Sequence, residues 1–318
     1  MNELVSVIIR RDPSQKAATI PAQLKQQTYP HFEGLLLCPK EERKRQTPLV
    51  EDPRFCKVET ENKSGGQAKN DGIRFARGKY LLFLQEGDWI HKTFLEKLMN
   101  SCAGWGAKLS GCRFLPRDNT EKMIGEDVIT LSSGEETLAT LFSESPALLN
   151  RAGGKLYHKD LFCGLLFPED KEREEEWVVP RLILKAKSAA FHSARLYQPD
   201  KKDDPLSFRQ KSLAHIEEAL EVLIKRASYL QSQGLPDLAA RTEQVFFSRL
   251  VAIDDQLLKG NDKPRQEAWQ KKREVFRSRA ADFSSGKIGR LFTSVYFSFP
   301  RVVGRVYGRQ SRGENGFE

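Results

Sequence analysis

The segment 61–98 constrains the fold most, because a glycine-rich loop, a short helix and an apolar strand follow one another there. Small and apolar residues recur along one face of 65–76, a spacing that predicts a helix, and Gly78 is expected to end it as a C′ glycine. The run 80–84 is continuously apolar, as in a strand buried on both faces of a parallel sheet. The turn 85–89, QEGDW, follows it. Ligands of open α/β sheets bind at the carboxyl ends of strands, so this turn is the first candidate for a binding site.

Strands and helices alternate around this segment. Apolar runs predict strands at 4–9, 35–37, 57–59 and 112–114, and helical spacing occurs at 20–27, 133–142 and 177–187. Such alternation indicates βαβ units, so we expect an α/β domain with a mixed, mostly parallel sheet flanked by helices.

The C-terminal third has a different pattern. Two apolar stripes at helical spacing, separated by Gly234 and Pro236, predict a helical hairpin. Beyond it, 13 Lys/Arg and three acids lie between Lys263 and Arg312, although the whole chain has a net charge of only +9. We therefore expect an α/β domain at 1–207, a helical hairpin at 208–262 and a basic amphipathic tail at 263–318.

The composition of the tail suggests a membrane surface. Aromatic and aliphatic residues alternate with arginines at 287–309, which favours an interfacial segment on anionic lipid, where apolar burial and charge attraction add. Docking onto a partner subunit is the alternative, and no nucleic acid motif is present. The five cysteines are scattered, and no apolar run reaches the roughly 18 residues that span a bilayer. We expect a cytoplasmic protein, peripheral at the inner face of the cell membrane.

Several short motifs occur in the order and spacing of one enzyme family. They are Val5–Ile9, Gln27–Pro30, Glu61-Asn62, Ala68–Ile73, Arg77–Tyr80, Phe83-Leu84, Gly87–Trp89, Lys155–Tyr157, Phe167–Glu169 and Pro180–Lys187. On these motifs the chain resembles the family 2 glycosyltransferases over about residues 4–207. The resemblance implies a GT-A (Rossmann-like) fold. It also implies transfer of a sugar from a nucleotide-sugar donor, which we expect to be UDP-linked, to a glycan or lipid-linked acceptor.

The resemblance also assigns roles to four residues. Glu175, flanked by Glu174, falls where the family has the general base that acts on the acceptor hydroxyl. Lys69 and Asn70 fall in the donor-binding motif, with Lys69 in the place of an arginine that offsets the diphosphate charge. The simpler interpretations are a solvated first helical turn for the glutamates and a surface position for Lys69.

The metal-binding motif departs from the family pattern. The family's D-x-D aligns with Gln85-Glu86-Gly87, and Asp88 lies just past it. Mn²⁺ and Mg²⁺ prefer carboxylate oxygens, so Asp88 is the candidate metal ligand and any metal dependence is expected to be weak. Glu86 could join Asp88 only if alternate positions of the turn converged, and Asp88 could equally be a helix cap. Together with Lys69 and Asn70, the residues Gln85, Glu86 and Asp88 form the predicted nucleotide-sugar site.

Two functional hypotheses follow. The first is an inverting hexosyltransferase of bacterial cell-envelope polysaccharide synthesis. The second is a non-catalytic protein of the same fold that binds a partner glycosyltransferase or a glycan. The substituted D-x-D and the replacement of the family's D-D-G-S by residues 38–41, CPKE, favour the second, whereas Lys69, Asp88 and the acidic triplet 174–176 favour the first.

Overall fold

The computed structural model describes residues 2–11, 19–40, 52–61, 64–114, 127–144, 150–200, 211–258, 262–280 and 283. The chain divides into two compact units, Met1–Asp203 and Asp204–Glu318. The first unit is an α/β domain and the second is helical. The predicted hairpin and the predicted tail therefore fall within one unit.

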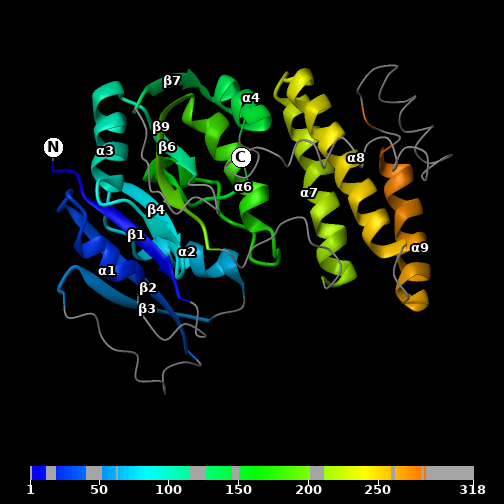
Figure 1. Ribbon diagram of the computed structural model, residues 1–318, viewed down its shortest axis with the longest axis horizontal. Coiled ribbons are helices and arrows are strands. Elements are labelled where there is room, and N and C mark those ends of the chain that lie inside the picture. The colour runs from blue at the N-terminus through cyan, green and yellow to red at the C-terminus, as the bar shows by residue number, and fades with distance from the viewer. Residues whose placement is uncertain are drawn as a thin grey trace. The chain divides into compact units, whose positions relative to one another are not determined.

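The first unit is built around one mixed sheet. Its strands are β1 (Val5–Arg10), β2 (Phe32–Pro39), β3 (Phe55–Thr60), β4 (Tyr80–Gln85), β5 (Trp89–Ile90), β6 (Leu109–Phe114), β7 (Ile129–Ser133), β8 (Lys155–His158) and β9 (Ser188–Gln198). Its helices are α1 (Thr19–Lys25), α2 (Gly65–Phe75), α3 (Phe94–Trp105), α4 (Gly134–Glu144), α6 (Glu174–Ala186) and the 3-10 helix η2 (Lys159–Phe162). Within the described residues the sheet has nine strands in the order β3-β2-β1-β4-β8-β6-β9-β5, with β7 paired to β9. Figure 1 shows β3, β2, β1 and β4 as neighbours in this sheet.

Strand directions agree with the predicted mostly parallel sheet. Strands β3, β2, β1 and β4 are parallel neighbours, and β6 is parallel to β9. Strand β8 is antiparallel to both β4 and β6, and β5 and β7 are antiparallel to β9. The register aligns Arg10 of β1 with Leu37 of β2 and Gln85 of β4, so the carboxyl ends of these strands meet at one edge. The predicted α/β fold is confirmed.

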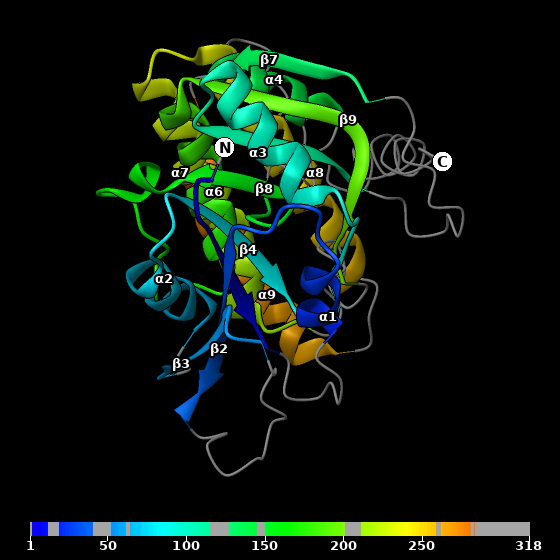
Figure 2. The ribbon, with the colours of Figure 1, turned by 90° about the vertical axis from the view of Figure 1, so that its left-hand side faces the viewer.

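Helices cover both faces of the sheet, because β1 and β4 are apolar on both. Val7 and Ile9 of β1 belong to a core cluster that contains the apolar residues of α1 and α3. Ile8 points to the other face, where α2 approaches so closely that a Cβ on Gly72 would lie 2.5 Å from the Ile8 side chain. Figure 2 shows α1 and α2 on opposite sides of β1 and β4.

Gly78 does not have the predicted role. Helix α2 ends at Phe75 with Ala76 as its C-cap, and Gly78 is absent from the glycines with positive φ. A Cβ on Gly78 would instead lie 2.6 Å from both the Leu4 carbonyl oxygen and the Ser6 amide nitrogen. A glycine is required at position 78 because two backbone segments come close together there. The prediction that Gly78 ends the helix as a C′ glycine was wrong.

Within the described residues, the second unit is a bundle of three helices, α7 (Leu213–Ser232), α8 (Pro236–Leu258) and α9 (Lys263–Ala280). Helices α7 and α8 form the predicted hairpin. The predicted tail begins with α9, whose Trp269 is fully buried and donates to Asp254 Oδ1 of α8 at 2.8 Å. The amphipathic stretch 287–309 lies outside the described residues. In the part of the chain that the structure describes, none of the helices combines the length and apolar character that crossing a membrane requires.

Candidate functional site

Lys69 of α2 forms ion pairs with two adjacent glutamates of α6. Its Nζ lies 2.6 Å from Glu174 Oε1 and 2.9 Å from Glu175 Oε1. The side chains of Lys69 and Glu174 are 9% and 7% exposed, whereas that of Glu175 is 25% exposed. The structure therefore brings three of the predicted site residues together, and Glu175 is the most accessible of them.

The first turn of α6 explains why these carboxylates converge. Glu174 and Glu175 are its first two residues, where the unpaired N–H groups and the helix dipole favour negative charge. Gly65, at the start of α2, leaves room for the first of them: a Cβ there would lie 2.4 Å from Glu174 Oε1. The same point is 3.4 Å from Nη1 of Arg10, the last residue of β1. The acidic pair thus lies near the carboxyl end of β1.

Glu175 is held at both carboxylate oxygens. Its Oε2 accepts from the backbone N–H of Ala152 at 3.0 Å, while Oε1 faces Lys69. Burial alone would raise the pKa of Glu175. The charge and hydrogen bond of Lys69, the Ala152 amide and the charge of Arg151 outweigh burial, so the pKa lies below its ordinary value. The carboxylate is therefore ionised at neutral pH, as a general base must be.

Lys69 is engaged in ion pairs with both glutamates. Burial would lower its pKa, but the charges of Glu174 and Glu175 and their hydrogen bonds raise it. One ammonium group is thus shared between two carboxylates, which neutralise it. In this arrangement Lys69 orients Glu174 and Glu175, and it could offset a diphosphate only by releasing them.

Asp88 connects the turn after β4 to the end of β9. Its Oδ2 accepts hydrogen bonds from the backbone N–H of Gln85 and from the Tyr197 hydroxyl, both at 2.9 Å. Its Oδ1 accepts from the backbone N–H of Asp200 at 2.9 Å. Burial raises the pKa of Asp88 to about 6, against the lowering effects of these hydrogen bonds and of the Arg151 charge. The carboxylate is buried and its hydrogen bonds fix the turn.

The Glu86 carboxylate binds a different element from Asp88. Its Oε1 accepts from the Thr19 hydroxyl at 2.8 Å, from the Ile20 amide at 3.2 Å and from the Thr19 amide, so it caps the N-terminus of α1. Gln85, the last residue of β4, lies beside Arg10 in the parallel register. Glu86 thus caps α1, whereas Gln85 pairs with the end of β1.

The predicted metal residues do not fit Mn²⁺ or Mg²⁺. These ions need several oxygen ligands that converge on one point. The oxygens of Asp88 receive three hydrogen bonds, Glu86 caps a helix, and Gln85 offers a neutral amide. Among the described residues, no group of three or more His, Cys, Asp or Glu is placed to hold a metal ion.

Asn70 supports the loop that leads to α6. Its side-chain amide donates to the Phe167 carbonyl at 2.8 Å and to Glu169 Oε1 at 3.3 Å, and its Oδ1 accepts from the Phe167 amide at 3.0 Å. A Cβ on Gly66 would lie 2.1 Å from the Pro168 carbonyl oxygen, so α2 packs directly on this loop. Both hydrogen-bonding groups of the Asn70 amide are therefore engaged in holding the loop.

Three residues of the site were not singled out from the sequence: Arg151, Lys155 and Tyr197. Lys155 is fully buried and donates from Nζ to the Arg151 carbonyl at 2.7 Å. Burial lowers the pKa of Lys155 to about 7. Tyr197 is the donor to Asp88, and burial raises its pKa well above the usual value. The motif Lys155–Tyr157 was the available signal for Lys155.

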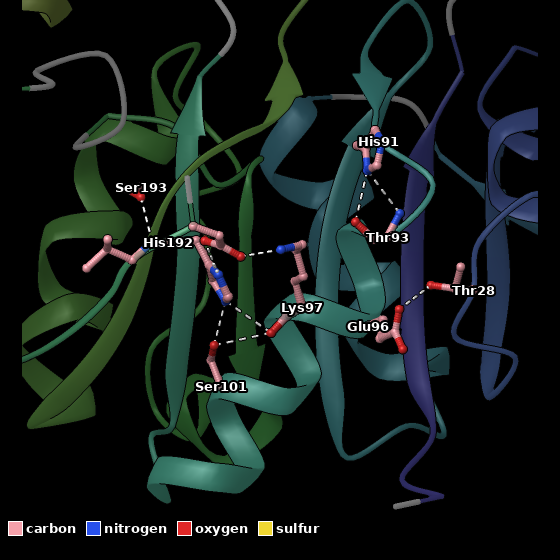
Figure 3. A network of polar contacts seen from close by, with 10 residues as sticks. Thr28, His91, Thr93, Glu96, Lys97, Ser101, His192 and Ser193 are labelled. Carbon is pink, nitrogen blue, oxygen red and sulfur yellow. Dashed lines mark hydrogen bonds and ion pairs between the residues drawn. The ribbon is translucent and has the colours of Figure 1, made fainter. Parts of the chain in front are cut away.

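A second polar cluster lies between α3 and β9. His192 Nδ1 is 2.9 Å from Asp127 Oδ1 and His192 Nε2 is 2.5 Å from Ser101 Oγ (Figure 3). The order Ser-His-Asp is that of a hydrolytic triad. However, Ser101 is 0% exposed, so a substrate cannot reach its hydroxyl. Asp127 also pairs with Lys97 of α3, and the cluster therefore joins α3 to the sheet.

Comparison with known proteins points to glycosyltransferases. Glycosyltransferase GlyA of Streptococcus pneumoniae serotype 4 (strain TIGR4) is 24% identical over 195 residues, which are 58% of this chain and 28% of GlyA. EpsH of Bacillus subtilis (strain 168), also named as a glycosyltransferase, is 31% identical over 78 residues, 24% of this chain and 22% of EpsH. The chain thus spans about a quarter of the length of these relatives. No model of a protein family matches the chain.

The fold is that of TarS from S. aureus. The TarS fragment 1–349 in complex with UDP-GlcNAc matches with a TM-score of 0.59 and 18% identity over 88% of this chain and 80% of the fragment. The same fragment with UDP gives 0.58 and 15% identity over 99% of this chain and 93% of the fragment. The α/β architecture is therefore one found in a nucleotide-sugar-binding protein.

Proposed function

We propose that the chain is an inverting family 2 glycosyltransferase with a GT-A fold, of the hexosyltransferase type, that uses a UDP-linked sugar donor. The observation that carries the proposal is the Glu175 carboxylate, which is ionised, one quarter exposed and held by Lys69 and Ala152 near the carboxyl end of β1. The similarity to GlyA and EpsH and the fold shared with TarS support it.

The chemistry assigned to Glu175 is that of a general base. It removes the proton of the acceptor hydroxyl while the hydroxyl oxygen attacks the anomeric carbon of the donor sugar. The bond from that carbon to the diphosphate oxygen breaks, and its electron pair leaves with the nucleoside diphosphate. Attack from the opposite side inverts the configuration. Lys69 and Glu174 position Glu175 and touch no reacting atom.

The acceptor and the location of the reaction belong to the same proposal. We expect a glycan or lipid-linked acceptor in cell-envelope polysaccharide synthesis. The basic tail, with 13 Lys/Arg and three acids between Lys263 and Arg312, would hold the protein at the inner face of the membrane, where such acceptors are found.

A non-catalytic role is the second candidate, and the turn after β4 favours it. Asp88 and Glu86 serve the fold through their hydrogen bonds, and Lys69 is neutralised by two glutamates. A protein with this site could bind a partner glycosyltransferase or a glycan without transferring a sugar.

Turnover of a panel of UDP-sugars distinguishes the two candidates. Glu175→Gln keeps the size of the side chain and removes the base, so it should lower the rate of sugar transfer by about 10²- to 10⁴-fold. Glu172→Gln makes the same chemical change at an exposed position just before α6 and should leave the rate unchanged. Circular dichroism of both variants checks the fold.

Two results would count against the proposal. Undiminished turnover in Glu175→Gln would remove the assignment of the base. If the unaltered chain neither turns over any donor nor binds UDP or GDP in a calorimeter, with or without Mn²⁺, the non-catalytic candidate stands.

A further inference from the structure

The turn after β4 leaves the proposed reaction without a metal to stabilise its leaving group. A departing nucleoside diphosphate carries at least two negative charges and needs positive charge close to its oxygens. Asp88 is 3% exposed and its carboxylate already accepts three hydrogen bonds, and Glu86 is 1% exposed and caps α1. A cationic side chain could supply this positive charge.

Two lysines of the site are poorly suited to this task. Lys69 is shared between Glu174 and Glu175. Lys155 has no exposed surface, and its Nζ donates to the backbone carbonyl of Arg151. A phosphate oxygen could reach either ammonium only if these contacts were broken.

Arg151 lies in the segment that joins the two halves of the site. Strand β8 is antiparallel to β4, with Leu156 opposite Leu82, so the residues that precede β8 lie toward the carboxyl end of β4. Two hydrogen bonds of Ala152 hold the segment that contains Arg151. The Ala152 amide donates to Glu175 Oε2 at 3.0 Å, and the Ala152 carbonyl accepts from Tyr157 at 3.2 Å.

The neighbouring residues place the segment between the two halves of the site. A Cβ on Gly153 would lie 2.3 Å from the Tyr197 hydroxyl, which itself donates to Asp88. The half-buried Arg151 side chain therefore starts from a backbone that contacts Glu175 on one side and the Tyr197–Asp88 pair on the other. Burial raises the pKa of Asp88 and of Tyr197, and the positive charge of Arg151 acts against burial at both groups and at Glu175.

We propose that Arg151 binds the diphosphate of the donor in the place that a divalent cation takes in metal-dependent enzymes, so that donor binding needs no metal. The inference rests on the proposed function, since it names the leaving-group contact of that reaction. A guanidinium is suited to this role because it is always charged and its N–H groups match two phosphate oxygens at once. When the bond to the anomeric carbon breaks, the electron pair goes to the diphosphate oxygen that Arg151 neutralises.

Calorimetric titration of the full chain with UDP, in EDTA and in Mn²⁺, tests this inference. The unaltered chain should bind UDP with the same affinity, within about twofold, in both buffers. Arg151→Gln should weaken binding about 10- to 100-fold, the usual effect of losing charge-assisted hydrogen bonds, and Arg151→Lys should lie between. Arg74→Gln, on an arginine that is exposed and pairs with Asp71, is the matched control and should bind like the unaltered chain.

The outcomes separate this inference from the proposed function. UDP binding that appears only with Mn²⁺, or that is unchanged in Arg151→Gln, overturns the role of Arg151 and leaves the transferase proposal intact. An unaltered chain that binds neither UDP nor GDP in either buffer overturns both. Thermal unfolding shows whether Arg151→Gln folds. If it does not, Arg151→Lys, which keeps the charge and loses the planar guanidinium, takes its place, and UDP binding unchanged in that variant overturns the guanidinium contact.

Discussion

Lys155 combines complete burial with a positive charge. Its Nζ donates a hydrogen bond to the Arg151 carbonyl, and burial, with a contribution from the Arg151 charge, lowers its pKa to about 7 although Glu175 and Cys112 act in the opposite direction. The folded chain therefore binds this proton more weakly than the unfolded chain does. Between the folded pKa and the ordinary lysine value of about 10.4, stability should rise with pH, and below about pH 7 the full cost of the buried charge remains.

Replacing Lys155 by methionine should expose this cost. The variant has no charge to bury, so near pH 6.5 it should be more stable than the unaltered chain by roughly 3 kcal/mol. Near pH 10 the lysine is neutral, and the variant should be less stable by about 1 kcal/mol because a hydrogen bond is lost. Urea unfolding across this pH range measures the difference, and Lys108→Met, at a 50% exposed side chain, should show none. A difference independent of pH would place the pKa of Lys155 near its ordinary value.

Among the elements, the loop from Phe167 to α6 depends on α2. Asn70→Ala would leave the Phe167 amide and carbonyl without their buried partner, which should lower the free energy of unfolding by about 2–4 kcal/mol. Hydrogen exchange of the Phe167 amide should accelerate more than exchange in β4. Arg74→Ala, on an exposed side chain of the same helix, should change stability by less than about 0.5 kcal/mol. An Asn70→Ala variant with unchanged exchange at Phe167 would contradict this support role.

Elements with one dominant pattern could be predicted from the sequence. Strand β4 is continuously apolar because both of its faces are buried, and α7 and α8 each carry an apolar stripe. Strand β9, SAAFHSARLYQ, lacks that signal, since alanine, serine, histidine and arginine occupy most of its length. Its position is set instead by pairing with β5, β6 and β7, which propensity does not describe.

The site was partly predictable for a similar reason. Glu175 and Lys69 could be placed by motif spacing, and the structure brings them within 2.9 Å. The hydrogen bond from the Asp200 amide to Asp88 joins residues 112 positions apart, and no local pattern reports such a contact. The same holds for Tyr197 and Arg151, whose importance depends on what the fold places beside them.

At the scale of the whole molecule, the residues of the candidate site lie in the first unit, whereas the basic tail lies in the second. Part of the basic charge in the second unit is used within its bundle: Lys272 pairs with Glu217, Arg273 with Asp254, and Arg279 with Glu221. These cations join α9 to α7 and α8 and have less attraction left for an anionic surface. The predicted membrane contact therefore depends mainly on the residues that follow the bundle.

Six basic residues and no acids occur between 284 and 312: Lys287, Arg290, Arg301, Arg305, Arg309 and Arg312. Replacing all six by glutamine should abolish sedimentation of the protein with phosphatidylserine-containing vesicles, since each basic residue near an anionic surface contributes roughly 1 kcal/mol. Binding of the unaltered chain should also weaken as salt is raised, because the attraction is screened. Glutamine at Lys272, Arg273 and Arg279 should instead lower the thermal stability of the bundle and leave vesicle binding nearly unchanged. Equal binding of the unaltered chain to neutral phosphatidylcholine vesicles, or none to either kind, would exclude an electrostatic membrane contact and leave a partner protein as the role of the tail.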